Sequence, residues 1–225
     1  MKNLAKLLTL FIFSGALLLT SCSSDTDTGN VSKITFFNVI EILGDEVTLH
    51  PVGDTYVDDG VIAYEGDLIV TDQVTTTNNV DANTIGIYTV DYSITNADGF
   101  EKVASRTVIV HPETDSGVDY SGVYTGVARG ETMPAGCTIT KIGPSTYHAD
   151  DFFGGVYCCG SRNYGLAYRL ETYFYISNDN TIYTALSTTS PWGPWDIEDA
   201  SISGTTLSHT VYYGTFGFGV ELIKE

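Results

Sequence analysis

Apolar and polar residues alternate with a period of two along much of this chain, and no long window shows the three-to-four residue spacing of an amphipathic helix. In residues 85–96 one face carries apolar side chains, namely Tyr88, Val90, Tyr92 and Ile94. Residues 96–99 (NADG) have turn chemistry, and alternation resumes over residues 102–110. The pattern therefore predicts a β-hairpin here and an all-β chain.

Four further short strands are predicted upstream of this hairpin, at residues 33–43, 46–50, 62–64 and 68–71. His111-Pro112 ends the run, because proline has no backbone donor for a continuing ladder. Residues 31–112 are therefore predicted to form a β-sandwich of short strands.

A second β-rich half is predicted at residues 118–225, after a polar linker at residues 113–117. It holds 11 of the 15 tyrosines and both tryptophans, and alternation is clear over residues 168–176 and 216–222. Glycines separate the predicted strands. We expect a second antiparallel domain, either a curved sheet or a small barrel.

Both halves resemble known families. Residues 53–63 (GDTYVDDGVIA) and 83–92 (NTIGIYTVDY) are similar to the conserved stretches of bacterial Ig-like surface domains. That resemblance implies an Ig-like β-sandwich serving as a spacer or adhesive module. Residues 119–126 and 147–155 resemble uncharacterised C-terminal domains of Bacteroidota lipoproteins from polysaccharide-utilisation systems, which implies an accessory role in glycan capture.

The N-terminus resembles a bacterial lipoprotein signal. Lys2 and Lys6 precede an apolar run, and residues 19–22 (LTSC) are similar to a lipobox. The resemblance implies a signal peptide at residues 1–21 and acylation of Cys22; the alternative is an ordinary signal peptide with an incidental cysteine. Residues 22–30 then form a polar tether whose Ser/Asp content resembles the export signal of surface lipoproteins, which implies the outer face of the outer membrane.

The net charge of the chain limits the classes of partner that we expect. Ten Lys and Arg against 28 Asp and Glu give a net charge of −18, so nucleic acid is not expected as a partner. An anionic membrane surface would repel the chain, which leaves the lipid anchor as the expected membrane contact.

The best candidate ligand site is the segment SPWGPWD at residues 190–196. Trp192 and Trp195 are separated by Gly-Pro and so belong to a loop or a strand edge. Flat aromatic rings stack on sugar C–H surfaces, and Asp196 can accept hydroxyl hydrogen bonds. The alternative is that one or both indoles plug an end of a small barrel.

A second candidate comprises Phe152 and Phe153, between paired aspartates and paired glycines, with Tyr164 downstream. Its alternatives are a solvated turn with a buried Phe pair and, less well supported by the spacing, a calcium loop. Neither candidate predicts a cofactor or a resident metal.

Three cysteines remain after Cys22. One disulfide is expected, from Cys137 to either Cys158 or Cys159, and a bond between the adjacent pair is a strained alternative. Buried thiols are a further alternative, whereas a zinc site lacks the spacing and the fourth ligand.

The sequence contains no Gly-x-Ser-x-Gly elbow and no His-x-x-x-His motif, so no enzymatic activity is expected. The leading hypothesis is a non-catalytic glycan-binding surface lipoprotein that cooperates with an outer-membrane importer complex. The alternatives are a structural or adhesive lipoprotein that contacts another protein, and a glycoside-active enzyme.

Overall fold

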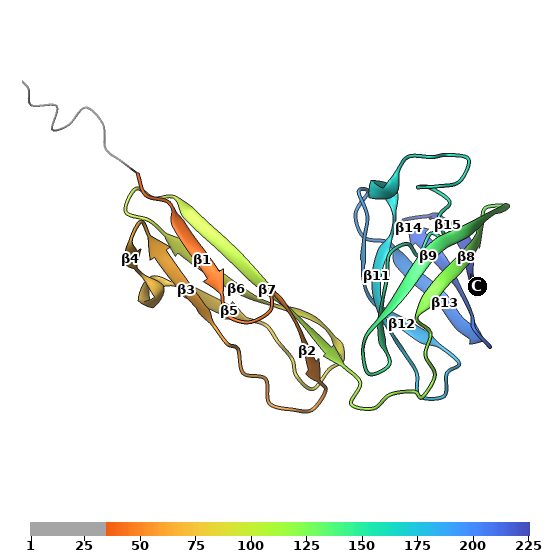
Figure 1. Cartoon of the computed structure of the whole chain (residues 1–225), viewed down its shortest axis with the longest axis horizontal. Helices are drawn as coiled ribbons and strands as arrows, with labels where there is room; N and C mark the ends of the chain where they lie inside the picture. Colours follow the sequence, from red (N-terminus) through yellow and green to blue (C-terminus); the bar gives the residue numbers. More distant parts are fainter. Residues whose placement is uncertain (1–34) are drawn as a thin grey trace, which may run out of the picture. The chain divides into compact units, whose positions relative to one another are not determined.

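The computed structural model describes residues 35–225, which form fifteen β-strands and two short 3-10 helices at Thr71–Gln73 and Leu166–Tyr168 (Figure 1). This confirms the all-β fold class. The predicted signal peptide, Cys22 and the tether lie outside the described residues. Within residues 35–225, no helix has the length and apolar character needed to cross a membrane.

The N-terminal domain is an Ig-like sandwich of two sheets. The first sheet is antiparallel and has the order β1-β3-β4, with β1 at Asn38–Ile42, β3 at Val61–Glu65 and β4 at Leu68–Ile69. The second has the order β2-β7-β6-β5, with β2 at Val47–Pro51, β7 at Glu101–His111, β6 at Gly86–Thr95 and β5 at Thr75–Asn78. Strands β2 and β7 are parallel, and the remaining pairs of that sheet are antiparallel.

The predicted hairpin is confirmed as β6 and β7. Thr95 pairs with Glu101 across the turn, and the Asn96 side chain accepts the backbone N–H of Phe100 at 2.8 Å. Val90, Tyr92 and Val108 are buried between the two sheets, as the alternation of β6 and β7 requires.

A buried ion pair explains part of the Ig-like sequence motif. Arg106 is 1% exposed, and its Nε lies 3.1 Å from an Asp58 carboxylate oxygen. The Tyr92 hydroxyl donates to the other Asp58 oxygen at 2.6 Å, and burial with this hydrogen bond raises the pKa of Tyr92 to about 12. The Arg106 guanidinium also donates to the carbonyls of Leu43 at 2.6 Å and Gly60 at 3.2 Å. The motif therefore ties the loop that precedes β3 to the centre of the second sheet.

The C-terminal domain is one eight-stranded antiparallel sheet that curls into a nearly closed barrel. Its order is β12-β11-β10-β9-β8-β15-β14-β13. The strands cover β8 Gly122–Ala128, β9 Glu131–Gly143, β10 Thr146–Ala149, β11 Glu171–Ile176, β12 Tyr183–Thr189, β13 Asp196–Ser203, β14 Thr206–Tyr213 and β15 Phe216–Lys224. The two edge strands approach each other where Thr188 Oγ1 donates to the Trp195 carbonyl at 2.7 Å.

The barrel interior includes a buried polar pair. His209 Nε2 lies 2.9 Å from the Phe152 carbonyl oxygen, and the Tyr183 hydroxyl lies 2.6 Å from His209 Nδ1. A carbonyl only accepts, so we assign the proton of the neutral ring to Nε2. The Tyr183 hydroxyl, which also lies 3.1 Å from the Ser208 carbonyl oxygen, then donates to Nδ1 over the shorter distance. Burial lowers the pKa of His209 to about 4 and keeps the ring uncharged at neutral pH.

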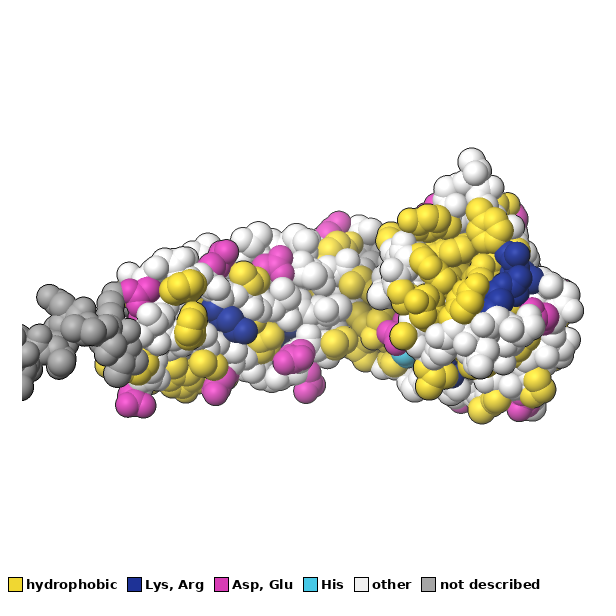
Figure 2. Space-filling view, turned by 90° about the horizontal axis from the view of Figure 1, so that it is seen from above, with side chains coloured by type: hydrophobic (Ala, Val, Ile, Leu, Met, Phe, Trp, Pro, Cys, Tyr) yellow, Lys and Arg dark blue, Asp and Glu magenta, His cyan; other side chains and the backbone are white. Residues whose placement is uncertain are grey.

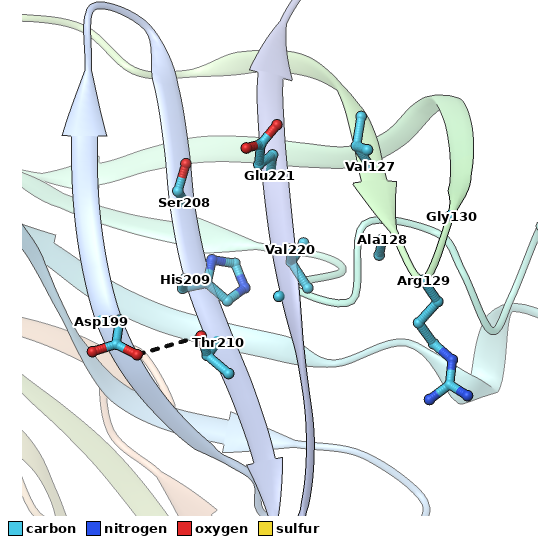
Figure 3. Close-up of a pocket in the computed structure, with 11 residues that line it drawn as sticks. Val127, Ala128, Arg129, Gly130, Asp199, Ser208, His209, Thr210, Val220 and Glu221 are labelled. Atoms are coloured by element: carbon cyan, nitrogen blue, oxygen red, sulfur yellow. Dashed lines mark hydrogen bonds between the residues drawn. The ribbon is translucent and has the colours of Figure 1, made fainter.

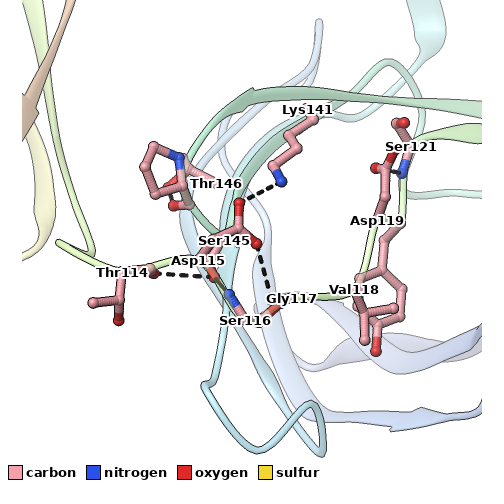
Figure 4. A network of polar contacts seen from close by, with 12 residues as sticks. Thr114, Asp115, Ser116, Gly117, Val118, Asp119, Ser121, Lys141, Ser145 and Thr146 are labelled. Carbon is pink, nitrogen blue, oxygen red and sulfur yellow. Dashed lines mark hydrogen bonds and ion pairs between the residues drawn. The ribbon is translucent and has the colours of Figure 1, made fainter.

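The segment that leads into β8 is bound to the C-terminal sheet. Ser116 donates its backbone N–H to Ser145 Oγ at 2.6 Å, and Asp115 forms an ion pair with Lys141 on β9 (Figure 4). The Asp115 carboxylate also accepts the backbone N–H of Gly117 at 3.0 Å. These contacts fix the start of the C-terminal domain against its own sheet.

Candidate functional site

The site is built on the segment 150–170, which joins β10 to β11 and begins inside the barrel. Asp151 is fully buried, and its carboxylate accepts backbone N–H groups from Phe153 at 2.9 Å, Gly155 at 3.0 Å and Leu170 at 3.1 Å. Burial raises the pKa of Asp151 to about 6, although these hydrogen bonds act in the opposite direction. One side chain thus holds both ends of the segment.

Close backbone contact locks the same segment against the sheet. A Cβ on Gly126 of β8 would lie 2.0 Å from the Gly154 carbonyl oxygen, and a Cβ on Gly136 of β9 would lie 2.5 Å from it. Gly154 itself has φ +65°, in the left-handed region that glycine tolerates best. Glycines on both sides therefore allow the segment to enter the barrel.

Phe152 and Phe153 are consequently core residues, and their prediction as ligand contacts is wrong. Both side chains are fully buried. The alternative of a solvated turn with a buried Phe pair is confirmed for the Phe pair and wrong for the turn, because residues 151–158 are all buried. The Phe153 ring centroid lies 4.8 Å from that of Trp195 and 4.9 Å from that of Tyr157. Phe153 therefore supports the surface aromatic residues from below.

Above Phe153, six aromatic side chains line an open cavity of about 420 Å³, and we call them the aromatic platform. They are Tyr157, Tyr164, Trp192, Trp195, Tyr213 and Phe216. Figure 2 shows a broad hydrophobic surface on the C-terminal domain with Lys or Arg side chains at its edge. The structure thus brings together three predicted residues from two loops: Trp192 and Trp195 from the loop between β12 and β13, and Tyr164 from the segment between β10 and β11.

The two tryptophans differ in accessibility. Trp195 is 6% exposed and packs its ring 5.4 Å from Tyr213, so it combines the predicted plugging role with a place in the cavity wall. Trp192 is only partly buried, with Tyr157 and Tyr168 each at a centroid distance of 5.0 Å. Tyr164 is 53% exposed. Of the two tryptophans, Trp192 therefore offers the more accessible ring, beside the exposed Tyr164.

Two arginines flank the platform. The Arg129 guanidinium carbon lies 5.1 Å from the Phe216 ring centroid and 5.2 Å from that of Phe218. The Arg162 guanidinium carbon lies 5.6 Å from the centroid of Tyr157, and Arg162 also forms an ion pair with Glu131 at 3.0 Å. Both cations lie within the range of cation–π attraction.

Asp196 lies outside the platform. It is exposed at the start of β13 and lines a different open cavity of about 480 Å³, together with Trp195 and Glu198. A third cavity, of about 430 Å³, lies over β8, β14 and β15, where Ser208, Thr210 and Glu221 contribute polar groups (Figure 3). The geometry thus separates the predicted acceptor Asp196 from the cavity shared by Trp192 and Tyr164.

The expected disulfide from Cys137 to Cys158 or Cys159 is wrong. The structure forms a disulfide between the adjacent residues Cys158 and Cys159, whereas Cys137 on β9 is a free, buried thiol. The buried segment 151–158 determines which sulfurs meet, and chain spacing does not reveal its path. Burial raises the pKa of Cys137 well above its usual range, so this thiol stays protonated.

Within residues 35–225, no group of three or more His, Cys, Asp or Glu side chains is arranged to hold a metal ion. The platform lining contains only aromatic residues, so no carboxylate projects from it. What the arrangement offers is an apolar, open stacking surface.

Sequence reasoning did not single out Tyr213, Phe216 or Arg129 as site residues. Tyr213 and Phe216 flank the β14–β15 turn, and Phe216 belongs to the predicted alternating strand at residues 216–222. Alternation shows that such residues share a face but does not identify which distant loop covers it. Arg129 had no signal beyond its position before Gly130 in a short turn.

Two protein-family models match this chain. A family model for the Ig-like domain of bacterial surface proteins matches residues 40–110, which confirms the predicted Ig-like domain. A second family model, which describes a C-terminal domain, matches residues 111–224 and so covers just over half of the chain. This chain belongs to the family that the C-terminal domain model describes. No curated protein matches the sequence.

Two solved structures are similar over most of the chain. The lipoprotein BT2262 from Bacteroides thetaiotaomicron is 29% identical; the match covers 84% of this chain and 100% of that one, with a TM-score of 0.43. A structure of CBM51-2 in complex with GlcNAc and INT domains from Clostridium perfringens ZmpB is 14% identical, covers 83% of this chain and 43% of that one, and has a TM-score of 0.29.

Proposed function

We propose that this protein is a non-catalytic, lipid-anchored surface protein whose C-terminal domain binds a polysaccharide on the aromatic platform. The observation that carries the proposal is the platform itself, six aromatic side chains around an open cavity of about 420 Å³. This volume lies within the usual range for small-ligand sites, roughly 300–1,000 Å³. Sugar rings present flat C–H faces that pack well on such surfaces.

The fold supports binding in preference to a merely structural role for these rings. Aromatic side chains in small domains normally complete the core, yet Tyr164 is 53% and Tyr213 50% exposed although Phe153 lies buried beneath the platform. Because the buried Phe153 packs against Trp195 and Tyr157 from below, the rings of the platform are held in place before a ligand arrives. Preorganisation of this kind lowers the entropic cost of binding.

The chemistry of the lining supports a non-catalytic role. Hydrolysis of a glycosidic bond ordinarily needs two carboxyl groups on either side of that bond. The six residues of the platform provide none, and the nearby Glu131 carboxylate is engaged by Arg162 and by Ser161. A ligand on the platform would therefore be held without being cleaved.

The proposed membrane attachment rests on the N-terminal sequence. An acylated Cys22 followed by a polar tether would concentrate the platform at the outer membrane surface, where weak single contacts become effective through multivalency. The proposed partner is an outer-membrane importer complex, which would transport the captured glycan. Palmitate labelling that disappears in a Cys22→Ala variant tests the anchor separately from the ligand.

The test of the platform is affinity electrophoresis of the full mature chain on a panel of neutral and acidic polysaccharides. We expect retention on at least one of them and an affinity roughly tenfold weaker for Trp192→Ala, since the stacking of a sugar on one ring contributes on the order of 1–2 kcal/mol. Phe100→Ala is the matched control, because Phe100 is a 52% exposed ring in the Ig-like domain. Absence of retention on every polysaccharide would contradict the proposal and favour a protein partner.

A further inference from the structure

The C-terminal domain has five basic side chains, and four of them are engaged by acidic or carbonyl groups of the same domain. Arg129 differs: within residues 35–225, its guanidinium makes no ion pair and no hydrogen bond. The four engaged pairs are Lys141 with Asp115, Arg162 with Glu131, Arg169 with Asp150, and Lys224 with the Asp119 carbonyl.

Local backbone geometry holds Arg129 at the platform. Ala128 pairs with Glu131 across a two-residue turn, in which Arg129 has φ +52° and Gly130 has φ +79°. The guanidinium lies over Phe216, which belongs to the platform, and over the neighbouring Phe218. Arg129 also lines the cavity over β8, β14 and β15, but in Figure 3 its side chain extends away from Asp199 and Glu221, the two acidic residues of that cavity.

We propose that the platform binds an acidic polysaccharide, whose carboxylate or sulfate groups are bound by Arg129 while neighbouring sugar rings stack on Trp192 and Tyr164. This inference rests on the proposed glycan-binding function and names its ligand class. Two aromatic faces orient the planar guanidinium, and its fork of N–H donors matches a carboxylate or sulfate. A neutral sugar would offer this exposed guanidinium hydroxyl groups but no opposite charge.

The overall negative charge of the chain contrasts with Arg129, which is unpaired within residues 35–225 and lies beside the platform. With a net charge of −18, the protein is a poor non-specific ligand for any polyanion. The platform lining nevertheless contains no acidic residue, and Glu131 already compensates Arg162. Charges more than about 10 Å away are largely screened at physiological salt. Among residues 35–225, Arg129 is therefore the basic side chain beside the platform that has no acidic partner.

The turn also provides a clean variant. Asparagine adopts left-handed backbone conformations more readily than most residues, so Arg129→Asn removes the cation and suits the φ of +52°. Lys224→Gln is the matched control for charge. Lys224 lies at the end of β15 opposite to Phe216, about 26 Å away at the usual rise per residue of a strand.

The experiment is isothermal titration calorimetry of the full mature chain with polygalacturonate beside its carboxyl-reduced form, and with dextran sulfate beside unsulfated dextran. The two acids distinguish a carboxylate from a sulfate as the bound group. We expect at least one acidic form to bind roughly tenfold more tightly than its uncharged counterpart, as one charge-assisted contact implies. Arg129→Asn should abolish that preference, and Lys224→Gln should retain it.

Three results would overturn the inference. Equal affinity for charged and uncharged forms, with both weakened by Trp192→Ala, would overturn the acidic ligand and leave the glycan platform standing. Equal weakening of both forms by Arg129→Asn would assign Arg129 a packing role over Phe216. Binding of neither form by the wild-type chain, together with no retention on the wider panel, would overturn the proposed function as well.

Discussion

The carboxylate of Asp151 accepts the backbone N–H of Leu170 at 3.1 Å, across nineteen residues of chain. The same carboxylate accepts the N–H groups of Phe153 and Gly155, so a single buried acid closes the segment that carries Tyr157 and Tyr164. The shape of the platform depends on this one side chain. An apolar residue could fill its volume but could not satisfy three buried donors.

Asp151→Ala is expected to destabilise the C-terminal domain by about 3 kcal/mol or more, because three buried N–H groups lose their acceptor. Asp151→Asn retains one acceptor oxygen and should lose roughly half as much. Urea unfolding of the full chain measures both values, and the aromatic platform should lose its ligand affinity in parallel. A loss below about 0.5 kcal/mol for the alanine variant would show that the segment is held by other contacts.

His209 and Asp151 are expected to act in opposite directions on stability between about pH 4 and pH 6.5. The folded pKa of His209 is lowered to about 4, so its contribution is present above pH 6.5 and is lost as the pH falls through 4. The folded pKa of Asp151 is raised to about 6, so its contribution is present below pH 4 and is lost as the pH rises through 6. Each effect is on the order of 3 kcal/mol.

Unfolding free energies measured from pH 4.5 to 6.5 separate the two groups. Relative to wild type, His209→Gln should become more stable with falling pH, and Asp151→Asn should become less stable with falling pH. Parallel pH profiles of wild type and both variants would contradict the assigned protonation states.

Gly126→Ala is expected to destabilise the domain by about 3 kcal/mol, because its Cβ would lie 2.0 Å from the Gly154 carbonyl oxygen and neither backbone can easily move. Gly219→Ala on β15 is the control. Nothing lies within 4 Å of its Cβ, and alanine restricts the unfolded chain, so it should be neutral or slightly stabilising. Thermal unfolding distinguishes the two; similar shifts would show that the segment 150–170 does not press against β8.

In the Ig-like domain, Asp58→Ala is expected to cost about 3–5 kcal/mol, because it leaves the buried Arg106 guanidinium without its nearest carboxylate. Asp59→Ala is the adjacent control. Asp59 is 67% exposed and lies 3.5 Å from Arg106 Nη1, so its loss should cost less than about 1 kcal/mol. Denaturant unfolding would reveal the difference, and equal costs would place the stabilising charge on the exposed carboxylate.

Much of the fold follows from alternation in the sequence. Alternation alone predicts strands at residues 168–176 and 216–222, and β11 and β15 bury the expected faces at Phe174, Val220 and Leu222. Strand β5 was not predicted from the sequence. Thr75–Asn78 is polar and exposed throughout, so it shows no alternation of apolar and polar residues. An edge strand needs no buried face, and its backbone pairing with β6 suffices.

The class of fold, the turn at Asn96 and the loop position of Trp192 follow from the amino-acid sequence, because burial period and turn chemistry are local properties. The Ig-like domain was identified from the resemblance of residues 53–63 and 83–92 to bacterial Ig-like surface domains. The folded arrangement was needed to show that Phe153 lies beneath the platform, that Cys158 bonds to Cys159, and that Phe216 joins Trp192 at one cavity with Arg129 over the Phe216 ring. These outcomes depend on the path of the irregular segment 150–170 and on the closure of the barrel. An irregular segment shows no periodic pattern of apolar residues, so its path cannot be predicted from the sequence. The hydrogen bonds of Asp151 and the close approach of Gly126 to Gly154 determine which distant side chains meet.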